Sequence, residues 1–248
     1  MSPTSDDQLD DLGTAVSLPS SVRRVVSLVP SLSESVWESG LLVGVTDWCP
    51  PEIDAARVRG TKNPDVDAVI ALRPDLVLAN AEENREVDLQ ALRAAGLAVW
   101  VTYPRTVPEA LVSLARMLDA CGVARPAWLD EAEAAWAVPF VGPRRTALVP
   151  IWRRPWMAVG SGTFTGDVLQ RLGIDNVLAD HPERYPKVSL DALPPYEMVV
   201  LPDEPYAFSP TDGPECFDVP ARCVSGRHLT WYGPSLAEAR SVLTAQLA

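Results

Sequence analysis

The sequence predicts an α/β protein built from two similar α/β lobes, each with a parallel sheet, that are joined by a helix. Short runs rich in β-branched residues alternate with amphipathic helical segments in both halves of the chain, which is typical of βαβ units. Between the halves, residues 107–138 carry two helical patterns and no strand. We therefore expect a lobe over 22–120, a bridging helix within 121–140 and a second lobe over 141–248.

In the first half, a β-branched run over 22–29 ends at Pro30, and a helical pattern opens at Ser31 and stops at Gly40. Further strands are predicted over 41–45, 76–79 and 98–101, and helices over 65–72 and 85–95. Glycine and proline at the boundaries end one element and begin the next. Strands that alternate with helices in this way predict a parallel sheet that is covered on both faces.

In the second half, helices are predicted over 108–120, 126–137, 163–172 and 235–247, and strands over 146–151 and 198–201. The segment Gly160–Gly166 superficially resembles a phosphate-binding loop, but its glycine spacing fits neither the dinucleotide nor the Walker pattern. We interpret it as a tight turn that supplies Ser161 or Thr163 as a helix N-cap.

Composition limits the partners of the chain. The 248 residues are 47% hydrophobic and carry a formal net charge of −12, which argues against nucleic-acid binding. No apolar run approaches the roughly 18 residues of a membrane-spanning helix, so no membrane insertion is expected. Residues 1–21 form an acidic stretch without the basic and apolar regions of a secretory signal. We expect a flexible tail there and, for the sequence as written, a cytoplasmic protein.

The residue inventory also limits the chemistry. Two histidines and four cysteines without a CxxC pair argue against zinc and HExxH sites and against an intrinsic cofactor or metal. Ser161 lies in no GxSxG motif. No catalytic residue is therefore assigned and the chain is not expected to be an enzyme. Cys216 and Cys223 are expected as thiols in a cytoplasmic setting, although they could form a disulfide in an oxidising compartment, so their redox state stays open.

The loops that follow the predicted strands are rich in large aromatic residues and arginines. Open α/β sheets bind ligands at such loops, where aromatic side chains can pack on a ligand face and arginines can pair with its carboxylates or phosphates. The alternative is that each tryptophan belongs to a lobe core and each arginine to a solvated turn. The candidate ligand-binding residues are Pro30, Ser31, Trp48, Asn63, Tyr103, Arg105, Trp152, Arg153, Arg154, Trp156, Tyr206, His228 and Trp231.

Three segments together resemble a known family: 24–34 (RVVSLVPSLSE), 42–51 (LVGVTDWCPP) and 63–79 (NPDVDAVIALRPDLVLA). The chain resembles the cobalamin-binding and iron-siderophore-binding proteins of bacterial ABC importers, the helical-backbone metal receptors. The resemblance is dense over 22–118 and looser beyond. It implies two Rossmann-like lobes joined by one long helix, with the ligand held in a cleft between the lobes.

The resemblance also implies roles for particular residues. His228 lies near a ligand-contacting position and could line the cleft or supply an axial nitrogen to cobalt or iron. Asp67 and Asp191 resemble the acidic residues with which such lobes dock onto an ABC permease. The expected function is non-enzymatic binding of a metal chelate, either cobalamin or another corrinoid, or a ferric siderophore. Two alternatives stay open: an extracytoplasmic importer component whose start is misassigned, and an intracellular enzyme on the same scaffold. Ligand identity, a permease partner and the oligomeric state are not determined.

Overall fold

The computed structural model describes residues 9–248, and the chain divides into two compact units. Unit 1 comprises the residues up to Pro104 together with Ala110–Leu129, and unit 2 comprises Arg105–Glu109 together with Asp130–Ala248. Each unit is an α/β structure built on a parallel sheet, as the sequence predicted. The lobe and bridge boundaries given above stay predictions.

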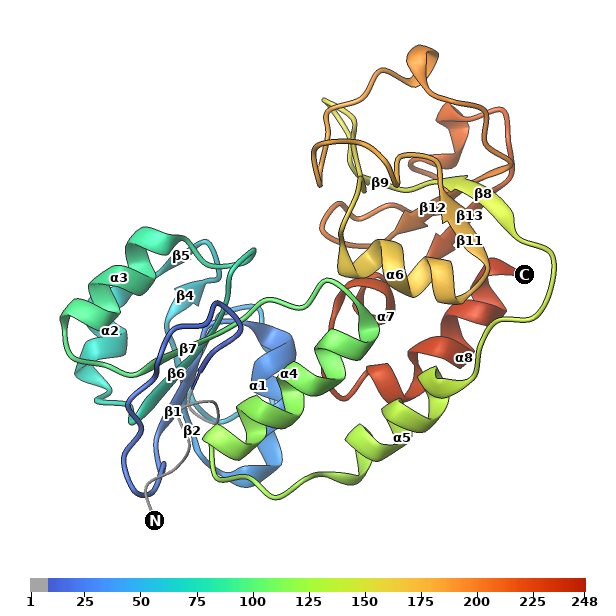
Figure 1. Cartoon of the computed structure of the whole chain (residues 1–248). Coiled ribbons are helices and arrows are strands. Elements are labelled where there is room, and N and C mark those ends of the chain that lie inside the picture. Colours follow the sequence, from blue (N-terminus) through green and yellow to red (C-terminus); the bar gives the residue numbers. More distant parts are fainter. Residues whose placement is uncertain (1–8) are drawn as a thin grey trace. The chain divides into compact units, whose positions relative to one another are not determined.

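The sheet of unit 1 has five strands in the order β3-β2-β1-β6-β7, all parallel. In Figure 1, α2 and α3 lie on one face of this sheet and α1 lies on the other. A separate short hairpin is formed by β4 and β5. The strands are β1 Val25–Ser27, β2 Leu42–Val45, β3 Ala56–Arg57, β4 Arg59–Gly60, β5 Asn63–Pro64, β6 Leu76–Asn80 and β7 Val99–Thr102.

The helices of unit 1 begin and end close to the predicted residues. Helix α2 is capped by Asp65, whose carboxylate accepts a hydrogen bond from the Ala68 amide, as expected of an N-cap aspartate. Helix α1 begins one residue earlier than predicted, because Pro30 occupies its first turn and its N-cap is Val29. The helices are α1 Pro30–Val36, the 3₁₀ helix η2 Trp37–Ser39, α2 Val66–Ala71 and α3 Glu86–Ala94.

The core of unit 1 forms where strands and helices bury apolar side chains on the sheet. Val26, Val77, Leu92 and Val101 are fully buried in one cluster, and burying each such side chain contributes about 1.5–3 kcal/mol. Trp100 of β7 is also fully buried. The sequence predicts a parallel sheet that is covered on both faces, and the sheet and its flanking helices agree with that prediction.

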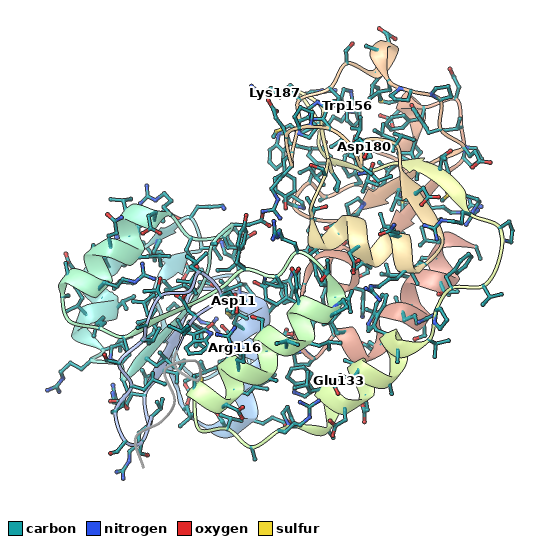
Figure 2. The ribbon with its side chains drawn as sticks, in the orientation of Figure 1. Asp11, Arg116, Glu133, Trp156, Asp180 and Lys187 are labelled. Carbon is teal, nitrogen blue, oxygen red and sulfur yellow. The ribbon has the colours of Figure 1, made fainter. Side chains whose placement is uncertain are left out.

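Residues 9–16 pack against the rest of unit 1, where the sequence predicted a flexible tail. Residues 1–8 lie outside the described residues. The Asp11 carboxylate accepts hydrogen bonds from the Tyr103 amide (2.7 Å) and the Ser113 hydroxyl (2.5 Å), and Arg116 pairs with it at 3.1 Å. Figure 2 shows Asp11 and Arg116 side by side at helix α4. Val16 is 4% exposed, so this segment is anchored by both charge and burial.

The sheet of unit 2 has four parallel strands in the order β11-β8-β12-β13, and β9 and β10 form a separate antiparallel pair. The strands are β8 Arg145–Leu148, β9 Pro150–Trp152, β10 Met157–Ala158, β11 Ile174–Asn176, β12 Met198–Pro202 and β13 Ala221–Val224. The helices are α6 Phe164–Arg171, α7 Gly226–Thr230 and α8 Leu236–Leu247, with short 3₁₀ turns η3 Leu190–Ala192 and η4 Pro214–Cys216.

Unit 2 departs from the sequence-based elements in three places. The predicted strand over 146–151 is two strands, β8 and β9. Strands β10, β11 and β13 were not predicted, because strands of two to four residues leave too short a pattern to recognise. Residues from His228 were assigned to a loop, whereas α7 is helical over Gly226–Thr230. Thr163 is the N-cap of α6 and accepts a hydrogen bond from the Gly166 amide, as one of the two predicted caps.

Two successive helices, α4 Val107–Ala120 and α5 Ala127–Ala137, occupy the strand-free middle of the chain as predicted. Both cross a boundary between the units. The Trp136 indole of α5 donates a hydrogen bond to the Leu236 carbonyl at 2.9 Å, which fixes the end of α5 on α8 within unit 2. Within residues 9–248, none of the helices has the length and apolar character needed to cross a membrane.

Candidate functional site

In unit 1, Trp48 and Asn63 approach the same glycine. Trp48 follows β2 and its side chain is 71% exposed. A Cβ atom placed on Gly60 would lie 3.2 Å from the Trp48 indole nitrogen and 2.7 Å from the Asn63 amide oxygen. Both predicted residues therefore lie against the tight β4–β5 hairpin, and only glycine leaves room for them. Trp48 presents a large apolar surface to solvent at the carboxyl end of β2.

The loop that carries Trp48 is held by one arginine. The Arg57 guanidinium donates to four backbone carbonyl oxygens of this loop at 2.9–3.2 Å, those of Thr46, Cys49, Pro50 and Ile53. Arg57 was not predicted as a site residue. A single arginine that follows a loop carries no sequence signal that its side chain folds back onto that loop. The loop is thus fixed by hydrogen bonds rather than by regular structure.

The other predicted residues of unit 1 differ in accessibility. Pro30 and Ser31 are buried in the first turn of α1, so their side chains contribute to packing there. Tyr103 follows β7 and is half-buried, with its amide bonded to Asp11. Asn80 and Asn84 join the carboxyl ends of three strands: Asn84 donates to the Leu28 carbonyl, and Asn80 donates to that of Thr102. This asparagine pair follows the predicted strand 76–79, but the sequence pattern did not indicate its role.

In unit 2, five aromatic side chains gather where β9 and β12 end. We call Trp152, Trp156, Tyr206, Phe208 and Phe217 the aromatic cluster. Trp156 stacks on Phe208 with ring centroids 6.1 Å apart and planes 4° apart, and Trp152 meets Tyr206 edge to face at 5.7 Å. Strand β9 packs beside β12, which brings residues about 50 positions apart together. Figure 2 shows Trp156 among the loops at this end of unit 2.

The aromatic cluster has a buried side and an exposed side. Phe208 is 3% exposed and packs with Leu148 and Leu201 of the sheet, whereas Trp152 is 43% exposed. The sequence analysis left open that each tryptophan belongs to a lobe core. This holds in part for Trp156, which is half-buried against the core of unit 2. The exposed rim of the cluster is the surface available to a ligand.

A charged network braces the aromatic cluster. Arg153 pairs with Asp212 and, at 2.7 Å, with Glu215, and it donates to the Cys216 sulfur at 3.2 Å. The Tyr206 hydroxyl donates to the other Asp212 oxygen at 2.7 Å, and this hydrogen bond raises the pKa of Tyr206. Hydrogen bonds from the Glu215 and Gly213 amides, together with one from the Arg153 side chain, lower the pKa of Glu215 to about 2. The sequence analysis missed both carboxylates, because their partner Arg153 lies about 60 positions earlier in the chain.

The adjacent Arg154 is exposed and makes no hydrogen bond or ion pair with any residue of the described part of the chain, 9–248. Its φ angle is 66°, in the left-handed region that few non-glycine residues adopt. Its positive charge acts on the Tyr206 hydroxyl, where it opposes the rise in pKa. Arg154 therefore places a cation next to the aromatic cluster.

His228 and Trp231 flank the end of α7. The His228 imidazole is bonded through Nδ1 to the Ser225 hydroxyl at 2.8 Å and through Nε2 to the Glu238 carboxylate at 3.1 Å. Both ring nitrogens are thus engaged with neighbouring side chains. The Arg227 guanidinium lies 5.0 Å from the centre of the Trp231 ring. These contacts tie α7 to α8, and axial coordination by His228 would require the release of one of its partners.

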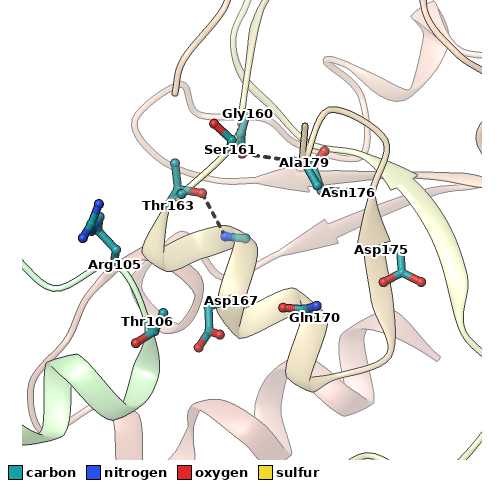
Figure 3. Close-up of a pocket in the computed structure, with 12 residues that line it drawn as sticks. Arg105, Thr106, Gly160, Ser161, Thr163, Asp167, Gln170, Asp175, Asn176 and Ala179 are labelled. Carbon is teal, nitrogen blue, oxygen red and sulfur yellow. Dashed lines mark hydrogen bonds between the residues drawn. The ribbon is translucent and has the colours of Figure 1, made fainter. Parts of the chain in front are cut away.

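A separate polar cavity of about 250 Å³ lies in unit 2, beside the start of α6 (Figure 3). Arg105 lies at its rim, and its lining includes Asp167 and Asp175. Asp167 pairs with Arg171 at 2.7 Å and Asp175 with Arg144 at 2.5 Å, so both carboxylates are already neutralised. The volume lies below the roughly 300–1,000 Å³ of typical small-molecule sites. A bulky ligand does not fit here, and the aromatic cluster is the better candidate.

The remaining titratable residues give no sign of a metal centre. Among residues 9–248, no three His, Cys, Asp or Glu side chains are grouped so that they could hold a metal ion. The four cysteines are free thiols, and burial raises the pKa of Cys121 to about 12. The predicted docking residues Asp67, in the first turn of α2, and Asp191, in η3, are both exposed.

Comparisons with known proteins bear on this site. No protein-family model matches the chain. Over 204 residues it is 28% identical to a cobalamin-binding protein of Halobacterium salinarum, a match that covers 74% of this chain and 54% of that protein. It is 24% identical over 185 residues to a vitamin B12-binding protein of Pectobacterium carotovorum, covering 69% and 67%. The chain spans about half the length of the Halobacterium relative.

Solved structures show the fold. The periplasmic vitamin B12 binding protein BtuF of Vibrio cholerae has a TM-score of 0.71 at 16% identity, covering 91% of this chain and 96% of that one. The periplasmic heme-binding protein RhuT of Roseiflexus has a TM-score of 0.72 at 18% identity, covering 91% and 97%. CeuE of Helicobacter pylori has a TM-score of 0.77 at 14% identity, covering 96% and 86%.

These likenesses confirm two predictions from the sequence. The chain has the fold of the class III periplasmic binding proteins, and its resemblance to cobalamin-binding and metal-chelate-binding proteins is confirmed by the curated relatives. Two of the solved structures are described as periplasmic. The expectation of a cytoplasmic protein therefore finds no support among them.

Proposed function

We propose that this protein is a non-enzymatic binding protein for a metal chelate, and that it serves as the extracytoplasmic substrate-binding component of an ABC importer. The observation that carries the proposal is the aromatic cluster of unit 2, with its exposed Trp152 next to the cation of Arg154. A flat chelate ring offers the large apolar face that such aromatic side chains bind, and stacking adds about 0.5–1.5 kcal/mol per aromatic residue beyond buried area.

Cobalamin is the ligand that we propose first. The sequence relatives are named as cobalamin- or vitamin B12-binding proteins, whereas structural neighbours at lower identity include heme-binding proteins. In unit 1, Trp48 and Asn63 at the β4–β5 hairpin supply a second exposed surface for the ligand. The chelate is the bound cargo and not an intrinsic cofactor. Its position between the lobes stays a prediction from the sequence.

The proposed permease contacts are the exposed carboxylates of Asp67 and Asp191, one in each unit. Each lies at the beginning of a short helical segment, α2 or η3, so neither is needed for the core of its unit. Exposed carboxylates can pair with arginines of a partner at little cost in stability, because surface ion pairs within one protein contribute only about 0–1 kcal/mol.

Titration of the protein with cyanocobalamin and with hemin, followed by tryptophan fluorescence and by the visible bands of the chelate, tests the proposal. We expect saturable binding of at least one chelate, which Trp152→Ala weakens about tenfold through lost stacking and lost apolar contact. Trp37→Ala is the matched control, because Trp37 is similarly exposed (40%) but lies in η2, after α1. Failure of the wild-type protein to bind either chelate at millimolar concentration would refute the proposal.

A further inference from the structure

We infer that the two adjacent arginines after β9 have separate roles. Arg153 is a positioning residue that holds the aromatic cluster in its binding geometry, and Arg154 supplies the charge that binds an anionic group of the chelate. The sequence alone assigned both residues to ligand contact. This inference rests on the proposed function and adds, beside cobalamin, a chelate with a peripheral carboxylate as a second substrate class of that site.

The contacts of Arg153 already engage its charge. Its side chain is 13% exposed, and its guanidinium faces two carboxylates, Asp212 and Glu215. The same guanidinium lies 5.7 Å from the centre of the Trp156 ring. A guanidinium with two carboxylate partners offers little to a third, because the incoming anion would have to displace one of them. Arg153 is therefore an internal brace and not a free anion-binding group.

The brace reaches the exposed rim through Asp212. One Asp212 oxygen pairs with Arg153 and the other accepts the Tyr206 hydroxyl at 2.7 Å. The Tyr206 ring in turn meets Trp152 edge to face at 5.7 Å and contacts Phe208 at 4.6 Å. Arg153 thus sets the orientation of Trp152 through two intermediates without touching the surface that Trp152 presents.

Arg154 has the opposite environment. It is exposed and unpaired within residues 9–248. Its backbone is left-handed (φ 66°), so the chain changes direction at Arg154. It lies in the turn between β9 and β10, two residues from Trp152 and two from Trp156 of the aromatic cluster. An unpaired guanidinium at the edge of an aromatic surface suits a flat ligand that carries a carboxylate, because Arg can bind the carboxylate bidentately while the ring stacks.

Two chelates of different charge separate the two roles. Hemin carries two propionate carboxylates, whereas cyanocobalamin carries a single phosphodiester anion and has no net charge. We expect Arg154→Met to weaken hemin binding about tenfold at low salt and to reduce its salt dependence, since it removes a charged contact. The affinity for cyanocobalamin should fall less than that for hemin, and the near-ultraviolet circular dichroism of the free protein should stay within error of the wild type.

Arg153→Met should behave differently. We expect the affinity for both chelates to fall by a similar factor, about tenfold, because the aromatic rim loses its geometry. The salt dependence of hemin binding should be unchanged, and the near-ultraviolet signal of the free protein should change. Asp212→Asn added to Arg153→Met should cost no further affinity, since both act through one chain of contacts. If Arg153→Met does not fold, Arg153→Lys replaces it in these measurements. Lysine keeps the charge but cannot contact both carboxylates with a planar guanidinium.

The results that overturn the inference are distinct from those that overturn the proposed function. A selective loss of hemin affinity and salt dependence in the Arg153 variants, with an unaltered near-ultraviolet signal, would make Arg153 the ligand contact. Wild-type binding of cyanocobalamin alone would overturn the assignment of an anionic chelate while leaving the proposed function intact. Binding of neither chelate would refute the proposed function and both roles with it.

Discussion

Removal of the Arg57 side chain should loosen the Trp48 loop and lower the stability of unit 1. The guanidinium donates to four carbonyls of residues 46–53 at 2.9–3.2 Å. Water can partly replace these donors because Arg57 is exposed, so we take the low end of the net value, about 0.5 kcal/mol per bond. Arg57→Met is then expected to cost about 2 kcal/mol and to lower the melting temperature by about 4–8 °C.

The measurement is urea unfolding followed by circular dichroism, together with calorimetric melting of the same variant. Arg59→Met is the matched control, because Arg59 makes a single exposed ion pair with Asp65 at 3.3 Å, for which about 0–1 kcal/mol is expected. Chelate affinity should also fall in Arg57→Met, since the exposed Trp48 loses its fixed loop. Equal stability losses in the two variants, or a loss below about 0.5 kcal/mol for Arg57→Met, would show that the four bonds do not hold the loop.

Two further changes test unit 2. Gly160→Ala should cost about 3 kcal/mol in the free energy of unfolding, because its Cβ would lie 2.1 Å from the Glu183 carbonyl oxygen, a backbone atom that cannot move aside. Stability should also depend on Glu215, whose pKa is lowered from 4.5 to about 2. A lowered pKa means that the contribution is complete above pH 4.5 and is lost as the pH falls toward 2, which acid titration of the melting temperature measures.

Each of these has its own control. Gly162→Ala places a Cβ in open space at φ 59°, so only the backbone penalty of about 1–2 kcal/mol is expected. An equal loss of stability in Gly160→Ala would show that the contact with the Glu183 carbonyl does not contribute. Glu215→Gln cannot titrate, so its melting temperature should change less between pH 4.5 and 2 than that of the wild type. The same acid profile in both proteins would show that Glu215 does not contribute there.

Several elements could be predicted from local sequence because their signals are local. Asp65 and Thr163 cap helices from the positions that the pattern indicated, and the fully buried strand β6 appears as an uninterrupted apolar run before Asn80. Short strands such as β13 were not predicted. The ends of β13 are set by its pairing with β12 and not by its own four residues. The segment 9–16 was misassigned because its acidic composition conceals the buried contacts of Asp11.

What the sequence determined by itself was the alternation of strands and helices, the resemblance to chelate-binding proteins, and the placement of aromatic and arginine residues in loops after strands. Only the tertiary structure decided which of these residues meet. Arg153 and Arg154 are neighbours with the same chemistry. Arg153 pairs with Asp212 and Glu215, which lie about 60 positions further along the chain, whereas Arg154 faces solvent. The charge of a side chain is written in the sequence, whereas its partners depend on how β9 and β12 pack, and the partners decide whether that charge is available to a ligand.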